Sequence, residues 1–199
     1  MEQYIEEALG YFEIGFQYLD LSENVSANKA ASGNKWMIVQ TGGDWNKLNK
    51  EYDEVVKWSD HQLGIPVLFN FYHGLELMLK GLYRLKKPIE TNHKLPDLLD
   101  AIENEYPESN FLCCFRKYIH LDKAPNILND FFEKSSANIV EWYQALKYPE
   151  STKGKKYYHS YLTCQEDNGG LFYAELSEDI QFIRVCIVSD VRSKYEELA

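Results

Sequence analysis

The stretch between Gly64 and Pro88 carries an unbroken helical pattern, and it constrains the fold more than any other part of the chain. Its apolar side chains recur every three or four residues: Leu68, Phe71, Tyr72, Leu75, Met78, Leu79 and Leu82. A stripe of this width has to be buried against other elements. Because proline cannot continue a helix interior, Pro88 ends the run. The pattern predicts the central helix of a helical bundle over residues 65 to 87.

Two glycines, Gly74 and Gly81, lie on one face of this predicted helix, two turns apart. Each costs about 1 kcal/mol relative to alanine in a helix interior. Such a cost is commonly offset by the close approach of a neighbouring backbone. We therefore expect another helix to pack tightly against this face.

The same spacing of apolar residues predicts further helices on both sides. They cover residues 5 to 20, about four turns after Asp44, residues 96 to 106, 111 to 121 and 125 to 148, and a final helix capped by Ser177. The Ser135-Ser136 pair is expected to bend the helix over 125 to 148. Residues 22 to 43, rich in Ser, Asn, Ala and Gly, predict a long loop with one short element near residues 36 to 39.

The helical pattern breaks between residues 151 and 175. Tyr157, Tyr158 and Tyr161 give the first part of this segment a strand-like composition, and Asn168-Gly169-Gly170 is typical of a turn. The expected fold is therefore mainly α. It is a single domain over residues 1 to 199, an up-and-down helical bundle with one small β-hairpin insertion near residues 157 to 174.

The charge of the chain bears on its partners. A net charge of -10 and a pI near 5.0 oppose non-specific binding to nucleic acid, although a local basic patch stays open. No apolar run reaches the roughly 18 residues that a membrane span needs, and the first residues lack the basic and apolar segments of a secretory signal. We expect a cytoplasmic protein without a membrane partner.

The four cysteines are Cys113, Cys114, Cys164 and Cys186. An adjacent pair and two isolated residues match no C-x-x-C spacing of metal or redox sites. We expect buried thiols, no metal centre and no cofactor.

Three short segments carry a resemblance to a known family. The run from Phe71 to Leu82, with Leu75-Glu76-Leu77-Met78-Leu79-Lys80 at its core, resembles the central helix of the HEPN superfamily. The turn His93-Lys94-Leu95 is similar to the one that leads into the next helix of that family. The end of a later helix, Leu146-Lys147-Tyr148-Pro149, resembles the family's Leu-Arg-Tyr-Pro ending. The resemblance covers roughly residues 65 to 150.

The resemblance implies a bundle of four to five helices that is often dimeric. Family members include metal-independent ribonuclease toxins, defence proteins and catalytically silent modules that pair with nucleotidyltransferases or other partners. Their ribonucleases carry arginine, four to six intervening residues, and then histidine. Here Arg116 and His120 are separated by only three residues, and no other arginine satisfies that spacing.

Arg116 and His120 are nevertheless the best catalytic candidates, since positions i and i+4 share one helical face. The guanidinium could hold a phosphate and the imidazole could act as acid or base. The competing interpretation is two surface residues on a short helix.

The binding candidates are His73, Glu76 and Lys80 on the central helix, together with His93 in the loop after it. Glu76 and Lys80 also have the spacing of an ordinary helical ion pair, and a lone histidine is more often a hydrogen-bonded residue at the core edge. Lys153, Lys155 and Lys156, next to two tyrosines, could bind single-stranded RNA or form a solvated loop.

The leading hypothesis is a non-catalytic HEPN-like interaction module, acting as a homodimer in a bacterial stress, toxin-antitoxin or defence setting. Its partner would be a nucleotidyltransferase, a toxin or an antitoxin. The aromatic content of 15% also favours an interface. One alternative is a metal-independent ribonuclease with a displaced site at Arg116 and His120, and another is a small-ligand pocket between helices.

Overall fold

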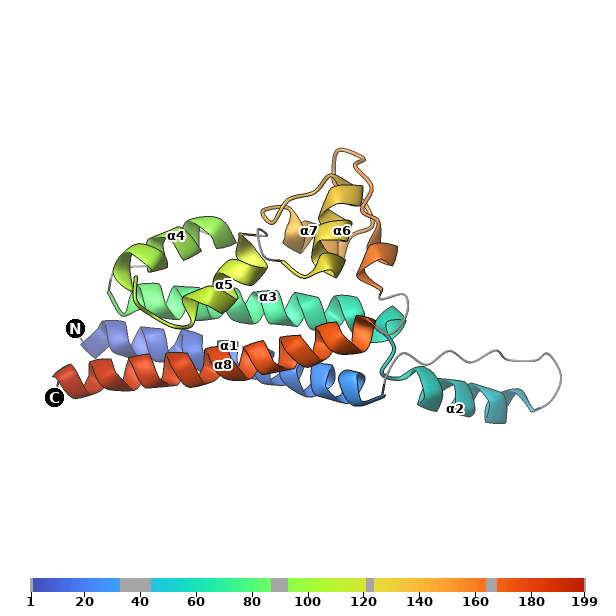
Figure 1. Ribbon diagram of the computed structural model, residues 1–199, viewed down its shortest axis with the longest axis horizontal. Helices are drawn as coiled ribbons and strands as arrows, with labels where there is room; N and C mark the ends of the chain where they lie inside the picture. Colours follow the sequence, from blue (N-terminus) through green and yellow to red (C-terminus); the bar gives the residue numbers. More distant parts are fainter. Residues whose placement is uncertain (1, 33–43, 87–92, 121–123, 164–167, 199) are drawn as a thin grey trace.

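The computed structural model describes residues 2–32, 44–86, 93–120, 124–163 and 168–198. Within these residues the chain forms eight α-helices and one 3-10 turn, and no strand. The elements are α1 (Glu2–Ser32), α2 (Trp45–Val56), α3 (Asp60–Arg84), α4 (Leu95–Glu105), α5 (Leu112–Ile119), α6 (Asn126–Ser135), α7 (Trp142–Lys147), η1 (His159–Leu162) and α8 (Asn168–Leu198). The three long helices α1, α3 and α8 run along the length of the molecule (Figure 1).

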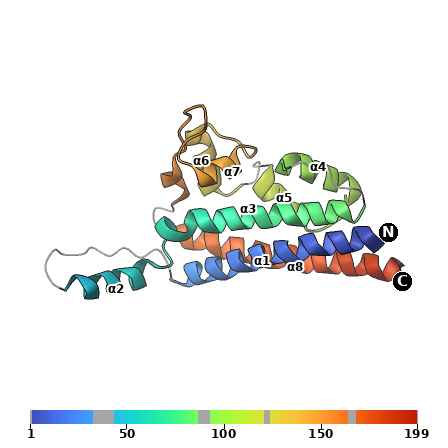
Figure 2. The same ribbon diagram turned by 180° about the vertical axis from the view of Figure 1, so that it is seen from behind.

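Helix α3 lies in the middle of the fold, as its pattern predicted. Helix α1 packs along one side of it, and α4, α5 and α7 cover the opposite side, an arrangement that Figure 2 shows from behind. Every residue of the predicted apolar face is fully buried: Leu68, Phe71, Tyr72, Leu75, Met78, Leu79 and Leu82. Tyr72 ties the layers together, since its hydroxyl donates to the Tyr118 carbonyl at the end of α5 (2.8 Å). The prediction of a central helix in an all-α bundle is confirmed.

The two glycines of α3 face α1, which confirms the expected close contact. A Cβ atom on Gly74 would stand 2.8 Å from Leu19, and one on Gly81 would stand 2.6 Å from the ring of Phe12. Both distances are shorter than carbon atoms tolerate. The glycines therefore set how closely α1 and α3 approach.

Helix α1 is twice as long as its apolar pattern predicted, because residues 22 to 32 continue it. Its buried face changes from large apolar side chains to Ser22 and Ser26, which are small enough to pack closely. The Ser22 hydroxyl donates a hydrogen bond to the Tyr18 carbonyl one turn earlier (2.9 Å), so this buried polar group has a partner within its own helix. The predicted long loop over residues 22 to 43 is thus wrong in its first half. The short element near 36 to 39 lies outside the described residues.

The predicted β-hairpin near residues 157 to 174 is not formed in the part of this segment that the structure describes. Residues 159 to 162 make the 3-10 turn η1, and α8 begins at Asn168, so Gly169 and Gly170 belong to a helix. The reason is that Phe172, Tyr173 and Leu176 continue the helical spacing of the final helix and are buried with it. Ser177, predicted as a cap, lies inside α8.

The helix predicted over residues 125 to 148 is broken rather than bent. Helix α6 ends at Ser135, and Ser136 adopts a left-handed backbone conformation with φ 48°. A second short helix, α7, follows from Trp142. The turn between them brings Trp142 back onto Phe131 (ring centroids 5.2 Å apart).

Helix α2 leaves the bundle and projects from the end opposite to the chain termini (Figure 1). Its start agrees with the prediction, since the Asp44 carboxylate accepts a hydrogen bond from the Asn46 backbone amide (3.0 Å). Among the helices that the structure describes, none is long and apolar enough to span a bilayer.

Candidate functional site

Four residues singled out in the sequence meet around the carboxylate of Glu76. Helix α3 presents His73, Glu76 and Lys80 on one face, and the segment before α4 brings His93 to them. The Lys80 Nζ donates to Glu76 Oε1 (2.6 Å), and His93 Nδ1 lies 2.8 Å from the same oxygen and 3.0 Å from Lys80 Nζ. His73 Nδ1 lies farther away, 3.8 Å from Glu76 Oε2.

The ion pair at the centre of this cluster is buried. Glu76 is 4% exposed and Lys80 is 7% exposed. Burial alone would raise the pKa of the Glu76 carboxyl, but the neighbouring His73 imidazole and the hydrogen bonds with Lys80 and His93 outweigh it and hold that pKa well below its usual range. Glu76 is therefore a carboxylate at every physiological pH. An ion pair of this kind needs both partners, because either charge alone would be costly to bury.

Aromatic side chains enclose the rest of the cluster. Tyr143 of α7 lies beside Glu76, and its hydroxyl donates to the Tyr72 carbonyl (2.8 Å). Burial, and then the neighbouring Glu76 charge, raise the pKa of Tyr143, so it stays protonated. The His73 ring packs edge-on against Tyr18 (centroids 4.6 Å apart). His73 is held as part of an aromatic cluster at the edge of the core.

The Glu76 cluster is a hydrogen-bonded network in which opposite charges are paired. The charges of Glu76 and Lys80 cancel, so the cluster offers no surplus positive charge for a phosphate. Its most exposed member is His93, whose side chain is 72% exposed and is anchored at Nδ1 by Glu76, whereas the His73 side chain is 33% exposed. The arrangement fastens the segment before α4 onto α3, and it presents an oriented imidazole at the surface.

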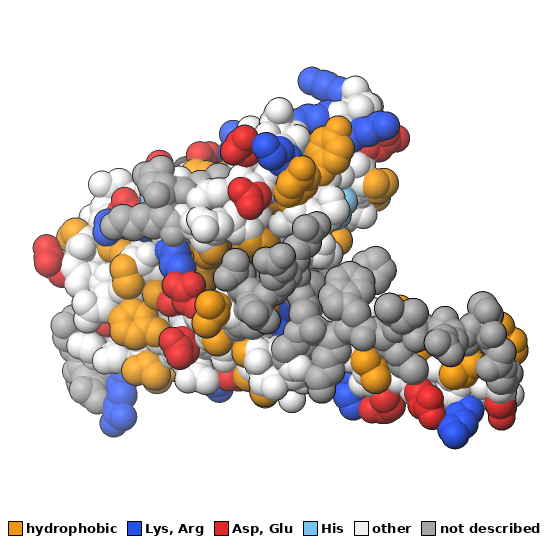
Figure 3. All heavy atoms as spheres, turned by 45° about the vertical axis from the view of Figure 1, so that its right-hand side comes forward, with side chains coloured by type: hydrophobic (Ala, Val, Ile, Leu, Met, Phe, Trp, Pro, Cys, Tyr) orange, Lys and Arg blue, Asp and Glu red, His pale blue; other side chains and the backbone are white. Residues whose placement is uncertain are grey.

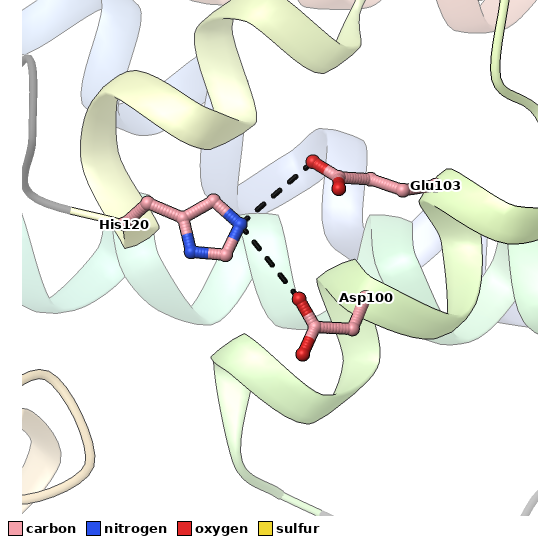
Figure 4. A group of neighbouring side chains, drawn as sticks. All are labelled: Asp100, Glu103 and His120. Carbon is pink, nitrogen blue, oxygen red and sulfur yellow. Dashed lines mark ion pairs between the residues drawn. The ribbon is translucent and has the colours of Figure 1, made fainter.

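The two catalytic candidates lie on one side of the chain as their spacing predicted, Arg116 in the last turn of α5 and His120 directly after it. Both point to the same acidic side chain, Glu103 of α4. Arg116 Nε donates to Glu103 Oε1 (2.6 Å), and His120 Nε2 lies 3.7 Å from that oxygen and 3.8 Å from Asp100 Oδ1. Figure 4 shows His120 directed at the two carboxylates. Two acids and one arginine leave this group with negative charge, which repels a phosphate.

Sequence reasoning did not find Asp100 and Glu103 as members of a site. They occupy polar positions of an amphipathic helix, where acidic residues are usually solvated. Their spacing, three residues apart, does place them on one helix face. Nothing in the local sequence indicates that this face meets the end of α5.

The basic cluster of Lys153, Lys155 and Lys156 belongs to the lobe formed by α6, α7 and η1, where Figure 3 shows basic side chains next to exposed apolar ones. The Lys155 Nζ donates a hydrogen bond to Glu141 Oε2 (2.7 Å). Tyr157, one of the two tyrosines expected to stack on RNA bases, is buried in the core and only Tyr158 is exposed. The stacking platform is thus reduced to a single ring.

A surface hollow and the cysteines are the two remaining candidate features. A hollow of about 610 Å³ lies between α6, η1 and the start of α8, with Asp130, Tyr161 and Phe172 among its lining residues. The expectation of buried thiols holds for Cys114, whose burial raises its pKa, but Cys113 is exposed, with the two Sγ atoms 3.9 Å apart. Cys164 lies outside the described residues.

Comparisons of the chain with protein-family models, with curated proteins and with solved structures find no match. The function proposed for the protein therefore rests on its own geometry and chemistry.

Proposed function

We propose that the protein is a non-catalytic, HEPN-like interaction module that acts as a homodimer. The observation that carries the proposal is helix α2, an amphipathic helix that projects from the bundle (Figure 1) and exposes Trp45 and Tyr52, while its last residue, Val56, is buried. On the family resemblance alone, the proposal extends to a role in bacterial stress or defence.

Helix α2 has 12 residues, a length at which an isolated helix is marginal in water. Most helical stability comes from packing an apolar face, yet Trp45 is 59% exposed and Tyr52 is 36% exposed. Both lie on the same side of the helix, with Leu48 between them. Tryptophan and tyrosine are the residue types that most often anchor protein interfaces. A second copy of the chain would supply the surface that α2 lacks on its own bundle.

A second apolar surface supports association. A groove of about 350 Å³ runs between α1 and α8 and is lined by Leu9, Phe12, Phe16 and Val188, among others. Leu9 and Val188 are half exposed there. An uncovered apolar helix and an uncovered apolar groove on one chain favour contact with another protein surface.

The two polar clusters support the absence of catalysis. The Glu76 and Lys80 charges cancel inside the fold, and Arg116 is bound to Glu103 rather than free to hold a phosphate. The HEPN assignment is supported by the way the three resembling segments meet. Glu76 and Lys80 of the first segment contact His93 of the second, and α7, which ends in the third, places Tyr143 beside them.

Light scattering coupled to size exclusion tests the proposal. The wild type is expected at twice the chain mass of 23.3 kDa. Trp45→Ser combined with Tyr52→Ser removes the two exposed aromatic side chains of α2 and is expected to give the monomer. The matched control, Lys50→Ser combined with Glu54→Ser, changes the opposite face by one charge of each sign and is expected to stay dimeric. A monomeric wild type, or a dimer that survives the apolar substitutions, would refute the proposal.

A further inference from the structure

Helices α4 and α5 bring three potential metal ligands together at their junction. Asp100 and Glu103 are three residues apart on α4, and His120 follows directly after α5. One oxygen from each carboxylate and Nε2 of the imidazole all lie within 4.8 Å of one another (Figure 4). In the part of the chain that the structure describes, this is the one group of three such side chains that converge so closely.

The separations within this group are too long for hydrogen bonds and suit a shared ion. His120 Nε2 lies 3.7 Å from Glu103 Oε1 and 3.8 Å from Asp100 Oδ1, whereas a hydrogen bond would bring these atoms to about 3 Å. Imidazole nitrogen and carboxylate oxygen each bind zinc at about 2.0–2.2 Å, so two ligands of one ion stand roughly 3 to 4 Å apart. The two distances from His120 Nε2 fall within that range, and the two carboxylate oxygens lie within 4.8 Å of each other. The nitrogen is directed between the carboxylates without being bonded to either.

Arg116 holds one of the ligands in place. Its Nε donates to Glu103 Oε1, the oxygen that faces His120. A carboxylate oxygen has two lone pairs, so it can accept this hydrogen bond and still bind a cation. Metal-binding carboxylates are commonly oriented in this way by a hydrogen-bond partner. With Arg116 included, the group keeps a net negative charge, which attracts a divalent cation.

The site is open to water on one side. The Asp100 side chain is 65% exposed, while Glu103 and His120 are about two-thirds to three-quarters covered. Three protein ligands with an open position are typical of sites that keep a bound water, whereas closed structural zinc sites use four. The imidazole favours zinc, cobalt and nickel over magnesium, which prefers oxygen ligands.

We propose that Asp100, Glu103 and His120 form a binding site for one first-row divalent cation, with Zn²⁺ as the best-suited ion. This departs from the expectation of no metal centre, which was drawn from the cysteine spacing alone. The proposal is independent of dimer formation, since all three ligands come from one chain.

Isothermal titration of the purified, metal-stripped protein with Zn²⁺ tests the site, with Co²⁺ as a spectroscopic probe. The wild type is expected to bind one ion per chain. With Co²⁺ it should show the visible absorption of a cobalt ion of low coordination number, and an equimolar amount of Mg²⁺ should leave this absorption unchanged. Substitution of a residue that only orients a metal ligand weakens metal affinity by roughly 10- to 100-fold. We expect a larger loss of Zn²⁺ affinity when a ligand itself is replaced, as in Asp100→Asn, Glu103→Gln and His120→Gln.

The matched control is Asp97→Asn, which makes the same carboxylate-to-amide change on α4 at an exposed side chain outside the three proposed ligands. This variant is expected to bind Zn²⁺ as the wild type does. Circular dichroism confirms that all variants are folded. The proposal is overturned if the wild type binds no Zn²⁺, if the three ligand variants bind it as tightly as the wild type, or if Asp97→Asn weakens binding as much as the ligand variants do.

Discussion

The phenyl ring of Phe12 on α1 packs against Gly81 on α3, where an added Cβ atom would stand 2.6 Å from the ring carbon Cε1. Gly81→Ala should therefore force α1 away from α3. Overpacking of this kind typically costs 1–3 kcal/mol, partly offset by the gain of about 1 kcal/mol in helix propensity. We expect a net loss of stability in urea denaturation. Gly10→Ala is the control, since nothing lies within 4 Å of that position and the substitution should stabilise α1 by about 0.5–1 kcal/mol.

Leu75 on α3 is fully buried among the layers of the bundle. Leu75→Asp would place an unpaired charge there, and we expect the protein to unfold or to lose most of its helical circular dichroism on mild heating. Val140→Asp makes the same chemical change at a half-exposed position and should leave the melting temperature nearly unchanged. Equal melting temperatures for the wild type and Leu75→Asp would contradict the central place of α3.

Glu76→Gln should destabilise the protein by about 3–5 kcal/mol at pH 7, because it leaves the buried Lys80 without its charged partner. The pH dependence has a defined sign. The folded pKa of Glu76 lies below its unfolded value of about 4.3, so the stability that its ionisation contributes is present above that pH and is lost as the pH falls further.

Urea denaturation between pH 3 and pH 7 measures this dependence. The difference between the wild type and Glu76→Gln should narrow below about pH 4.3. Glu133→Gln is the control, since this glutamate is exposed and pairs only with the exposed Lys134. Its effect should stay within about 0.5 kcal/mol throughout. A Glu76→Gln difference that is constant over the whole range would show that the carboxylate charge does not stabilise the fold.

The purified protein is not expected to cleave RNA. Arg116 is bound by Glu103, His120 faces two carboxylates, and the chain as a whole carries a charge of -10. An assay on the wild type, Arg116→Ala and His120→Ala decides the question. Removal of a positioned acid or base typically costs about 10² to 10⁴ in rate. Cleavage by the wild type that both substitutions abolish would establish the ribonuclease alternative, whereas cleavage that survives both would indicate contamination or another site.

The central helix could be predicted from the sequence because a helix with a wide apolar stripe is buried best in the middle of a bundle. The C-terminal half of α1 and the first turns of α8 could not be predicted from the sequence. Ser22 and Ser26 are polar residues typical of loops, yet they are buried where α1 packs closely. Gly169 and Gly170 are typical of a turn, yet the apolar contacts of Phe172 and Tyr173 fix the first turns of α8. In each case tertiary packing outweighed the local preference.

The polar clusters were predictable only in part. The spacing of Glu76 and Lys80 indicated an ion pair, but the same spacing occurs on exposed helices, so their burial was not foreseeable. The approach of His93 to that pair depends on where the start of α4 lies relative to α3, which the local sequence does not indicate. Glu103 links Arg116 to His120 from a different helix, a relationship that only the tertiary structure creates.

The position of α3 between two layers determines the order in which the molecule opens. Because α1 covers one side of it and α4, α5 and α7 cover the other, we expect its backbone amides to meet solvent only when these layers separate. In hydrogen exchange, α2 should take up deuterium before α3, because it projects from the bundle and, among its described residues, only Val56 at its end is buried. The amides around Leu75 should exchange last, at the rate of global unfolding, so that α3 reports the stability of the whole protein.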